Sequence, residues 1–174
     1  MRALVVFESL YGNTAAVGEV VAGSLRSRGF DVSVGPVTSV STAETDEVDL
    51  LIVGGPTHAH GMSRASTRRS GITDQKNTYA DPTTEPGLRE WLAALPLGRG
   101  RAAAAFDTRF DKPVLLTGSA AKGIGRRLEH LGFRVIVEPE SFFVTGENRL
   151  KDGEIERATA WAKVLTNSSQ GVAA

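Results

Sequence analysis

The chain has 174 residues, of which 41% are hydrophobic and 23% charged, and it contains no cysteine. This length and apolar content suit one compact domain with a substantial core. The 20 basic and 20 acidic residues balance, so charge gives no reason to expect nucleic acid or an anionic membrane as a partner. The lack of cysteine excludes disulfides, thiol redox chemistry and cysteine metal sites.

The amino-terminal segment predicts a buried strand followed by a helix. Residues 2–7 are nearly continuously apolar, as expected of a strand covered on both faces, and residues 15–28 carry apolar side chains near helical spacing. Because this segment holds no apolar run long enough for a signal peptide or a membrane span, we expect a cytoplasmic protein.

The turn between this strand and this helix, residues 8–14, predicts an anion site. Free backbone amides and the positive end of a helix dipole meet at such a turn. Ser9 and Thr14 add hydroxyl groups, and Gly12 lets the backbone approach a ligand closely. No lysine or arginine lies between Arg2 and Arg26, so we expect amides, hydroxyls and the dipole to hold a phosphate. The alternative is an ordinary turn in which Asn13 or Ser9 caps the helix.

The next segment continues the alternation of strands and helices. Residues 30–34 read as an edge strand, residues 40–49 have room for a short helix, and residues 49–55 form an apolar run typical of a buried strand. Residues 56–85 are rich in Ser, Thr, Arg, Asp and Gly, which predicts a long loop of functional importance. Residues 86–95 then predict a helix that ends before Pro96.

The last third of the chain predicts two more strands and two more helices. The alanine-rich run 101–106 favours helix by propensity, but its place between helical patterns indicates a central strand, followed by a loop over 107–113. A helix is expected over 120–131, and residues 133–144 read as one strand broken at Pro139. Asp152 is expected to cap a final helix.

Five strands alternating with helices predict one α/β domain. Right-handed crossovers turn this pattern into a doubly wound parallel sheet with helices on both faces. We expect the domain to span residues 1–166 and residues 167–174 to form a polar tail.

The run Ser9-Leu10-Tyr11-Gly12-Asn13-Thr14 resembles the Ser/Thr-x-Thr-Gly-x-Thr phosphate loop of flavodoxins, which holds the phosphate of FMN. It differs where Tyr11 replaces the usual threonine. The resemblance implies a flavodoxin-like sheet with strand order 2-1-3-4-5, in which ligands bind beside strands 1 and 3. It also implies an acidic protein, from which this neutral chain departs.

The resemblance further implies that the FMN ring lies between the loops that follow strands 3 and 4. The cofactor-binding residues expected on this basis are Ser9, Leu10, Tyr11, Gly12, Asn13, Thr14, Pro56, Thr57, His58, Phe106, Asp107, Thr108 and Arg109. His58, Phe106 and Phe110 are the main aromatic candidates for contact with the ring, with Tyr11 and Tyr79 as further candidates.

Arg109 carries a separate hypothesis. A guanidinium near the reducible edge of the flavin would favour an anionic reduced form, so that Arg109, with His58 as a proton donor or ring neighbour, would tune the cofactor towards hydride acceptance. In the alternative reading, Arg109 pairs with Asp107 or Asp111 on the surface.

The predicted function is that of an FMN-binding redox protein. It would pass electrons to a protein partner or to a small acceptor such as a quinone, either as a carrier or as an NAD(P)H oxidoreductase. The alternative is a flavin-free binding or signalling module on the same fold.

Two histidines and one serine suggest other chemistry. His58 and His60 lack a convincing third ligand, so no metal site is expected. Ser119 and Lys122 match a Ser-x-x-Lys pattern, but no Lys-Thr-Gly triplet accompanies it, and Ser119 is expected to cap a helix instead.

Three arginines and two tryptophans complete the prediction. We expect Arg64, Arg68 and Arg69 to lie in solvated loop, with contact to a phosphate of NADPH or to an acidic partner as the alternative. Trp91 and Trp161 fall on apolar helical faces and are expected in the core.

Overall fold

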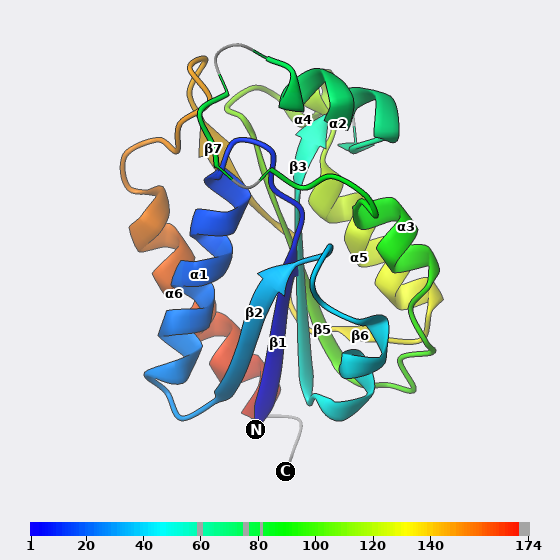
Figure 1. Cartoon of the computed structure of the whole chain (residues 1–174). Coiled ribbons are helices and arrows are strands. Elements are labelled where there is room, and N and C mark those ends of the chain that lie inside the picture. Colours follow the sequence, from blue (N-terminus) through cyan, green and yellow to red (C-terminus); the bar gives the residue numbers. More distant parts are fainter. Residues whose placement is uncertain (59–60, 75–76, 81, 171–174) are drawn as a thin grey trace.

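The computed structural model describes residues 1–58, 61–74, 77–80 and 82–170, which form a central sheet between two layers of helices (Figure 1). Its strands are β1 (Arg2–Phe7), β2 (Asp31–Pro36), β3 (Leu50–His58), β4 (Gly61–Met62), β5 (Ala102–Phe110), β6 (Arg134–Val135) and β7 (Glu140–Val144). Its helices are α1 (Asn13–Arg26), η1 (Thr42–Glu47, a 3₁₀ helix), α2 (Ala65–Ile72), α3 (Leu88–Ala93), α4 (Val114–Thr117), α5 (Ala120–His130) and α6 (Glu154–Gln170).

The sheet has the predicted doubly wound topology. Its parallel strands run in the order β2-β1-β3-β5, and both β6 and β7 pair with β5 in parallel, while β4 forms a short antiparallel pair with β3. Since β6 and β7 flank Pro139, they are the two pieces of the predicted broken strand. The predicted order 2-1-3-4-5 is therefore confirmed.

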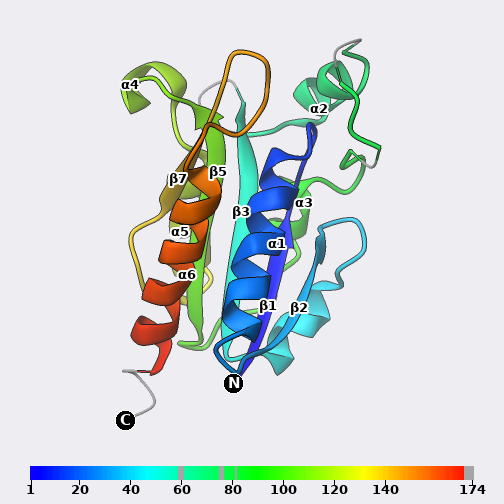
Figure 2. The same ribbon diagram turned by 90° about the vertical axis from the view of Figure 1, so that its left-hand side faces the viewer.

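Helices cover both faces of the sheet, as predicted. The pair α1 and α6 lies on one face and the pair α3 and α5 on the other (Figures 1 and 2). One apolar cluster packs under α1 and α6 and includes Trp161, and a second packs under α3 and α5 and includes Trp91. The prediction that both tryptophans lie in the core is confirmed.

Two central strands run further than the apolar pattern indicates. β3 continues to His58 and β5 continues to Phe110, so residues 107–110 are strand and not the predicted loop. The extension of β5 is paired with β7 in register, from Phe106 opposite Glu140 to Phe110 opposite Val144. Polar residues are tolerated here because their side chains are hydrogen bonded to α1, to β3 and to α5.

The segment predicted as a long loop over 56–85 contains β4 and α2. The sequence of α2, ASTRRSGI, has no apolar stripe, so its helical pattern is invisible to an analysis of hydrophobic spacing. The final helix begins at Glu154, two residues later than the expected cap at Asp152. It continues to Gln170 with Ser169 buried, past the expected start of the tail at residue 167; residues 171–174 lie outside the described residues.

At Gly54 the ring of Phe106 lies very close to the backbone of the sheet. Gly54 pairs with Phe7 and Phe106 on the neighbouring strands, and a methyl group on its Cα would overlap the ring of Phe106. That ring is fully buried and packs edge-on against Phe142 and Trp161, at centroid distances of 6.1 and 5.9 Å. The ring has no room to retreat, so only glycine fits at this position.

We expect Gly54→Ala to lower the free energy of unfolding by about 1–3 kcal/mol, because the added methyl group overpacks the core. Urea denaturation measures the change. Gly23→Ala is the matched control: this position lies in α1 with no atom within 4 Å of an added Cβ, so alanine should raise stability by about 0.5–1 kcal/mol. Equal stabilities of the two variants would contradict the close packing at Gly54.

Candidate functional site

The turn from β1 into α1 presents free backbone amides at the carboxyl edge of the sheet. Gly12 precedes α1 with a left-handed φ of 85°, and no side chain caps the helix there. Within the described residues, the backbone N–H groups of Tyr11, Gly12, Asn13 and Thr14 have no hydrogen-bond acceptor. Together with the helix dipole, these amides fit an anionic group such as a phosphate.

The hydroxyl groups of this turn are partly engaged within the protein. Ser9 Oγ accepts a hydrogen bond from the Ala15 amide at 3.3 Å, which leaves the serine proton available for a ligand. Thr14 Oγ1 lies 2.8 Å from Thr108 Oγ1, and both side chains are buried. Thr14 thus joins α1 to β5, whereas the sequence predicted a hydroxyl aimed at the ligand.

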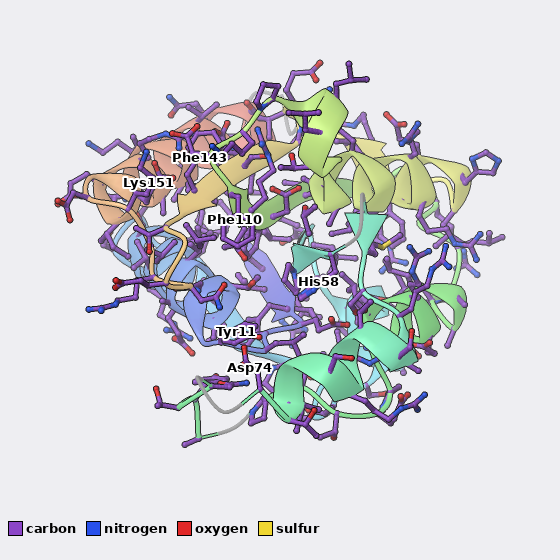
Figure 3. The ribbon with its side chains drawn as sticks, turned by 90° about the horizontal axis from the view of Figure 1, so that it is seen from above. Tyr11, His58, Asp74, Phe110, Phe143 and Lys151 are labelled. Atoms are coloured by element: carbon purple, nitrogen blue, oxygen red, sulfur yellow. The ribbon has the colours of Figure 1, made fainter. Side chains whose placement is uncertain are left out.

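Residues from the segment between α2 and α3 pack against this turn. Thr83 forms two hydrogen bonds with Ser9, from its amide to the Ser9 carbonyl at 2.7 Å and from the Ser9 amide to its Oγ1 at 2.9 Å. The Tyr11 hydroxyl donates to Asp74 at 2.9 Å (Figure 3). An ideal Cβ on Gly12 would lie 2.9 Å from the ring of Tyr79, so this ring covers Gly12.

A buried ion pair lies directly behind the turn. Glu8 is fully buried, and its Oε2 accepts from the Leu88 amide at 2.7 Å and lies 3.8 Å from Nη1 of Arg68. Arg68 is 1% exposed and also pairs with Glu85 at 2.9 Å and Glu90 at 3.2 Å. Arg68 is therefore an internal residue, contrary to the expectation of a solvated loop, while Arg64 and Arg69 are exposed.

Asp107 joins three elements beneath the site. Its Oδ2 is fully buried and accepts hydrogen bonds from the Thr57 hydroxyl at 3.0 Å, the Ser119 hydroxyl at 2.8 Å and the Ala121 amide at 2.9 Å. Ser119 also accepts from the Lys122 amide, which confirms its predicted role as a helix cap. Thr57 Oγ1 also accepts from the Ala120 amide at 2.8 Å. The side chains of Thr57 and Asp107 therefore hold β3, β5 and α5 together.

Arg109 is buried and organises the loop after β5. Its guanidinium donates to the carbonyls of Phe110 at 3.2 Å and Lys112 at 2.7 Å, and it lies over the ring of Phe143 at 4.9 Å. The alternative reading, in which Arg109 pairs with Asp107 or Asp111 on the surface, is not supported, because within the described residues Asp111 pairs with Lys151 at 2.7 Å and Asp107 is fully buried. Nη2 of Arg109 has no acceptor within the described residues and remains available to a ligand.

A small cavity lies where the carboxyl ends of β1, β3, β5 and β7 meet. Its volume is about 90 Å³, and it is lined by Tyr11, Asn13, Pro56, Thr57, His58, Thr108, Arg109, Phe110, Val144 and Asn148. Figure 3 looks down on this region, with Tyr11, His58 and Phe110 around it. Seven of these ten residues belong to the set predicted from the sequence. Phe110, Val144 and Asn148 were missing from that set, although Phe110 was an aromatic candidate.

The remaining predicted residues lie around or beneath the cavity. Leu10 and Phe106 are buried in the protein, and Phe106 packs with Phe142 and Trp161, away from any ring ligand. Asn148 reaches the site because Asn13 Nδ2 donates to its carbonyl at 2.8 Å. No local sequence signal marks Asn148, since it comes from the loop after β7.

His58 closes one side of the cavity. Burial lowers the pKa of its imidazole, so the ring is neutral at neutral pH. The described residues contain no group of three metal-ligating side chains. His60, the second histidine of the pair considered as a metal site, lies outside the described residues.

No helix within the described part of the chain is long and apolar enough to span a membrane.

Comparison with known proteins identifies the fold. No family model and no curated protein matches the sequence. Among solved structures, flavodoxin 1 from Bacillus cereus is 18% identical with a TM-score of 0.70, and the match covers 96% of this chain and 98% of that one. A flavodoxin of Streptococcus pneumonia TIGR4 is 23% identical (TM-score 0.66, covering 96% and 99%), and an archaeal flavodoxin is 20% identical (TM-score 0.66, covering 98% and 99%). These matches show a flavodoxin-like fold over the whole length of the chain.

We expect Arg68→Met to destabilise the protein by about 3–5 kcal/mol at pH 8, because it leaves the buried carboxylate of Glu8 without its cation. Burial raises the pKa of Glu8 and Arg68 lowers it, so removing Arg68 raises this pKa further. The loss relative to the unmodified protein therefore begins where Glu8 ionises in the folded state, above the ordinary value of 4.5, and is larger at pH 8 than at pH 5.

Urea denaturation at pH 5 and pH 8 measures this pH dependence. Arg69→Met, at an exposed position of the same helix, is the control and should change stability little at either pH. The same loss at both pH values for Arg68→Met would contradict an ionised Glu8 as the source of the effect.

Proposed function

We propose that this protein binds FMN at the carboxyl edge of its sheet and passes electrons to a protein partner or to a small acceptor such as a quinone. The observation that carries the proposal is the set of unpaired amides at Tyr11, Gly12, Asn13 and Thr14, which face the place where the flavodoxin-like phosphate loop holds its ligand. FMN, when bound, supplies one- and two-electron redox chemistry. The protein supplies the orientation and the electrostatic surroundings.

The phosphate of FMN would bind the amides of residues 11–14 and the hydroxyl of Ser9. The ring would lie against Pro56, His58, Thr108 and Arg109, which line the cavity. Because ligand pockets usually measure about 300–1,000 Å³, we expect side chains at the cavity rim to move when the ring enters. Phe110 is the main candidate, since it lines the cavity and is 46% exposed.

The surface beside the cavity suits contact with an electron acceptor. The end of β5 exposes Phe110, and α4 exposes Leu115 and Leu116, with Leu115 91% exposed. Exposed apolar side chains next to a binding site favour contact with an apolar surface or molecule. Whether the acceptor is a protein or a quinone is decided by steady-state assays with NADH or NADPH as donor and quinones as acceptors.

A second candidate is a flavin-free binding module on the same fold. The small volume of the cavity and the cover of Tyr79 over Gly12 favour it. The two candidates differ in whether the purified protein takes up FMN.

We expect the protein to bind FMN at least about tenfold more tightly than riboflavin, because charge-assisted hydrogen bonds from the amides hold the phosphate. Fluorescence titration of the flavin-free protein measures both affinities.

Gly12→Ala should weaken the binding of FMN more than that of riboflavin, since alanine is strained at φ 85° and its Cβ meets the ring of Tyr79. Gly146→Ala, with open space around the added methyl group, is the control. Equal binding of FMN and riboflavin would exclude the phosphate site, and binding of neither would favour the flavin-free module.

We also propose that Arg109 tunes the cofactor. A cation at the cavity wall stabilises negative charge added on reduction, so Arg109→Gln should lower the reduction potential of bound FMN. Potentiometric titration measures it, and Lys112→Gln, which removes an exposed cation from the same loop, should change the potential much less. An unchanged potential in Arg109→Gln would show that Arg109 only holds the loop.

A further inference from the structure

A second hollow lies between α3 and α5. It measures about 430 Å³, and its basic wall consists of Arg89 from α3 with Arg126 and Arg127 from α5, beside His130. No acidic residue lines it among the residues that the structure describes. We call this hollow the basic groove. Its size is that of a small-molecule site, and its charge selects an anion.

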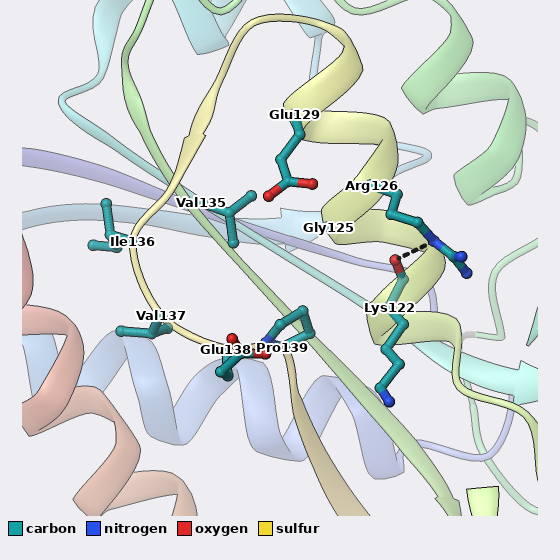
Figure 4. Close-up of a pocket in the computed structure, with 9 residues that line it drawn as sticks. All are labelled: Lys122, Gly125, Arg126, Glu129, Val135, Ile136, Val137, Glu138 and Pro139. Carbon is teal, nitrogen blue, oxygen red and sulfur yellow. Dashed lines mark hydrogen bonds between the residues drawn. The ribbon is translucent and has the colours of Figure 1, made fainter.

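The cations of the basic groove on α5 are not neutralised by neighbours. Within the described part of the chain, Arg126, Arg127 and His130 form no ion pair with an acidic side chain. Arg126 Nε donates to the Lys122 carbonyl at 3.2 Å, and Figure 4 shows its guanidinium turned away from Glu129. Within the described residues, the charge of Arg126 is therefore exposed and has no acidic partner.

The groove in Figure 4, on the other side of α5, gives a useful contrast. It measures about 470 Å³ and contains Glu129 and Glu138 as well as Lys122 and Arg126. Mixed charges of this kind select no class of ligand, whereas the basic groove has one sign only.

The dipole of α5 accounts for only some of the basic residues in the basic groove. Arg127 and His130 lie in the last turn of α5, where cations stabilise the helix dipole. Arg89 comes from another helix, and it is already held in place by donating to the carbonyls of Met62 and Ser63 at 2.8 Å each. Its Nη1 has no acceptor within the described residues. A fixed guanidinium with a free edge is suited to bind a phosphate oxygen.

The floor of the basic groove is apolar. Met62, Leu92 and Ala93 line it, and Gly123 leaves space above them, since an added Cβ there would meet only Met62 Cε at 3.6 Å. Apolar side chains beside several arginines match a ligand with a planar ring and a phosphate group. Nucleotides have this chemistry.

We propose that the basic groove binds the adenosine-phosphate part of a nucleotide. Adenine would lie on Met62 and Ala93, and the phosphate would contact Arg89, Arg126 and Arg127. Met62 is paired with Thr57 in the β3–β4 hairpin, so the groove adjoins a strand that also lines the cavity. The ligand is either a dinucleotide electron donor or a mononucleotide effector, which share this adenosine phosphate. The proposal does not depend on FMN binding.

The test is a titration of ¹⁵N-labelled, flavin-free protein followed by amide chemical shifts. ADP, 2′,5′-ADP and NADPH are the probes, with adenosine and inorganic phosphate as partial ligands. We expect shifts confined to α3, β4 and α5, and Arg126→Gln combined with Arg127→Gln should weaken nucleotide binding by about tenfold or more. Both side chains are exposed, so the double variant should fold.

The control is the combination Arg2→Gln and Arg149→Gln, which removes two exposed cations elsewhere. Tighter binding of 2′,5′-ADP and NADPH than of ADP would identify the ligand as a dinucleotide. Binding of ADP that is as tight as theirs, or tighter, would identify it as a mononucleotide. Lack of shifts with all three nucleotides would overturn the proposal. Adenosine binding as tightly as ADP, or the same loss in the control variant, would also overturn it.

Discussion

The carboxylate of Glu8 and the guanidinium of Arg68 are both removed from water, and the arrangement around the candidate site depends on their pairing. Glu8 directly precedes the turn that presents free amides, while Arg68 belongs to a helix without an apolar stripe. A buried charge is costly unless it is paired, so α2 can dock only where its arginine reaches this carboxylate. Gly87 allows this approach, because a side chain there would overlap the guanidinium. The ion pair thus helps to position the segment that covers the turn, together with the hydrogen bonds of Thr83 to Ser9.

This difference explains which parts of the fold could be predicted. Strands such as residues 2–7 are apolar because both faces are covered, so their pattern alone identifies them. The polar helix α2 and the ends of β3 and β5 carry no such pattern, since hydrogen bonds hold them. Asp107 is the clearest case. A charged residue after an apolar run suggests a loop, but the carboxylate of Asp107 accepts hydrogen bonds from three donors inside the structure.

The candidate site was predictable to the extent that it lies at strand ends. Parallel strands bring their carboxyl ends to one edge, so Tyr11, Thr57 and Thr108 meet there whatever the details of packing. The point along a strand at which the core ends and the site begins is harder to predict. Phe106 lies two residues before Thr108 and is already in the core. Asn148 arrives from a distant loop through a bond to Asn13, which no local pattern in the sequence indicates.

The hydrogen bonds around Asp107 have a consequence for ligand binding. They join β3, β5 and α5 through protein groups alone, so the spacing of the strand ends does not depend on a ligand. A ligand that binds at these strand ends would meet groups that are already held in place. It would then lose little of its binding free energy to ordering the protein.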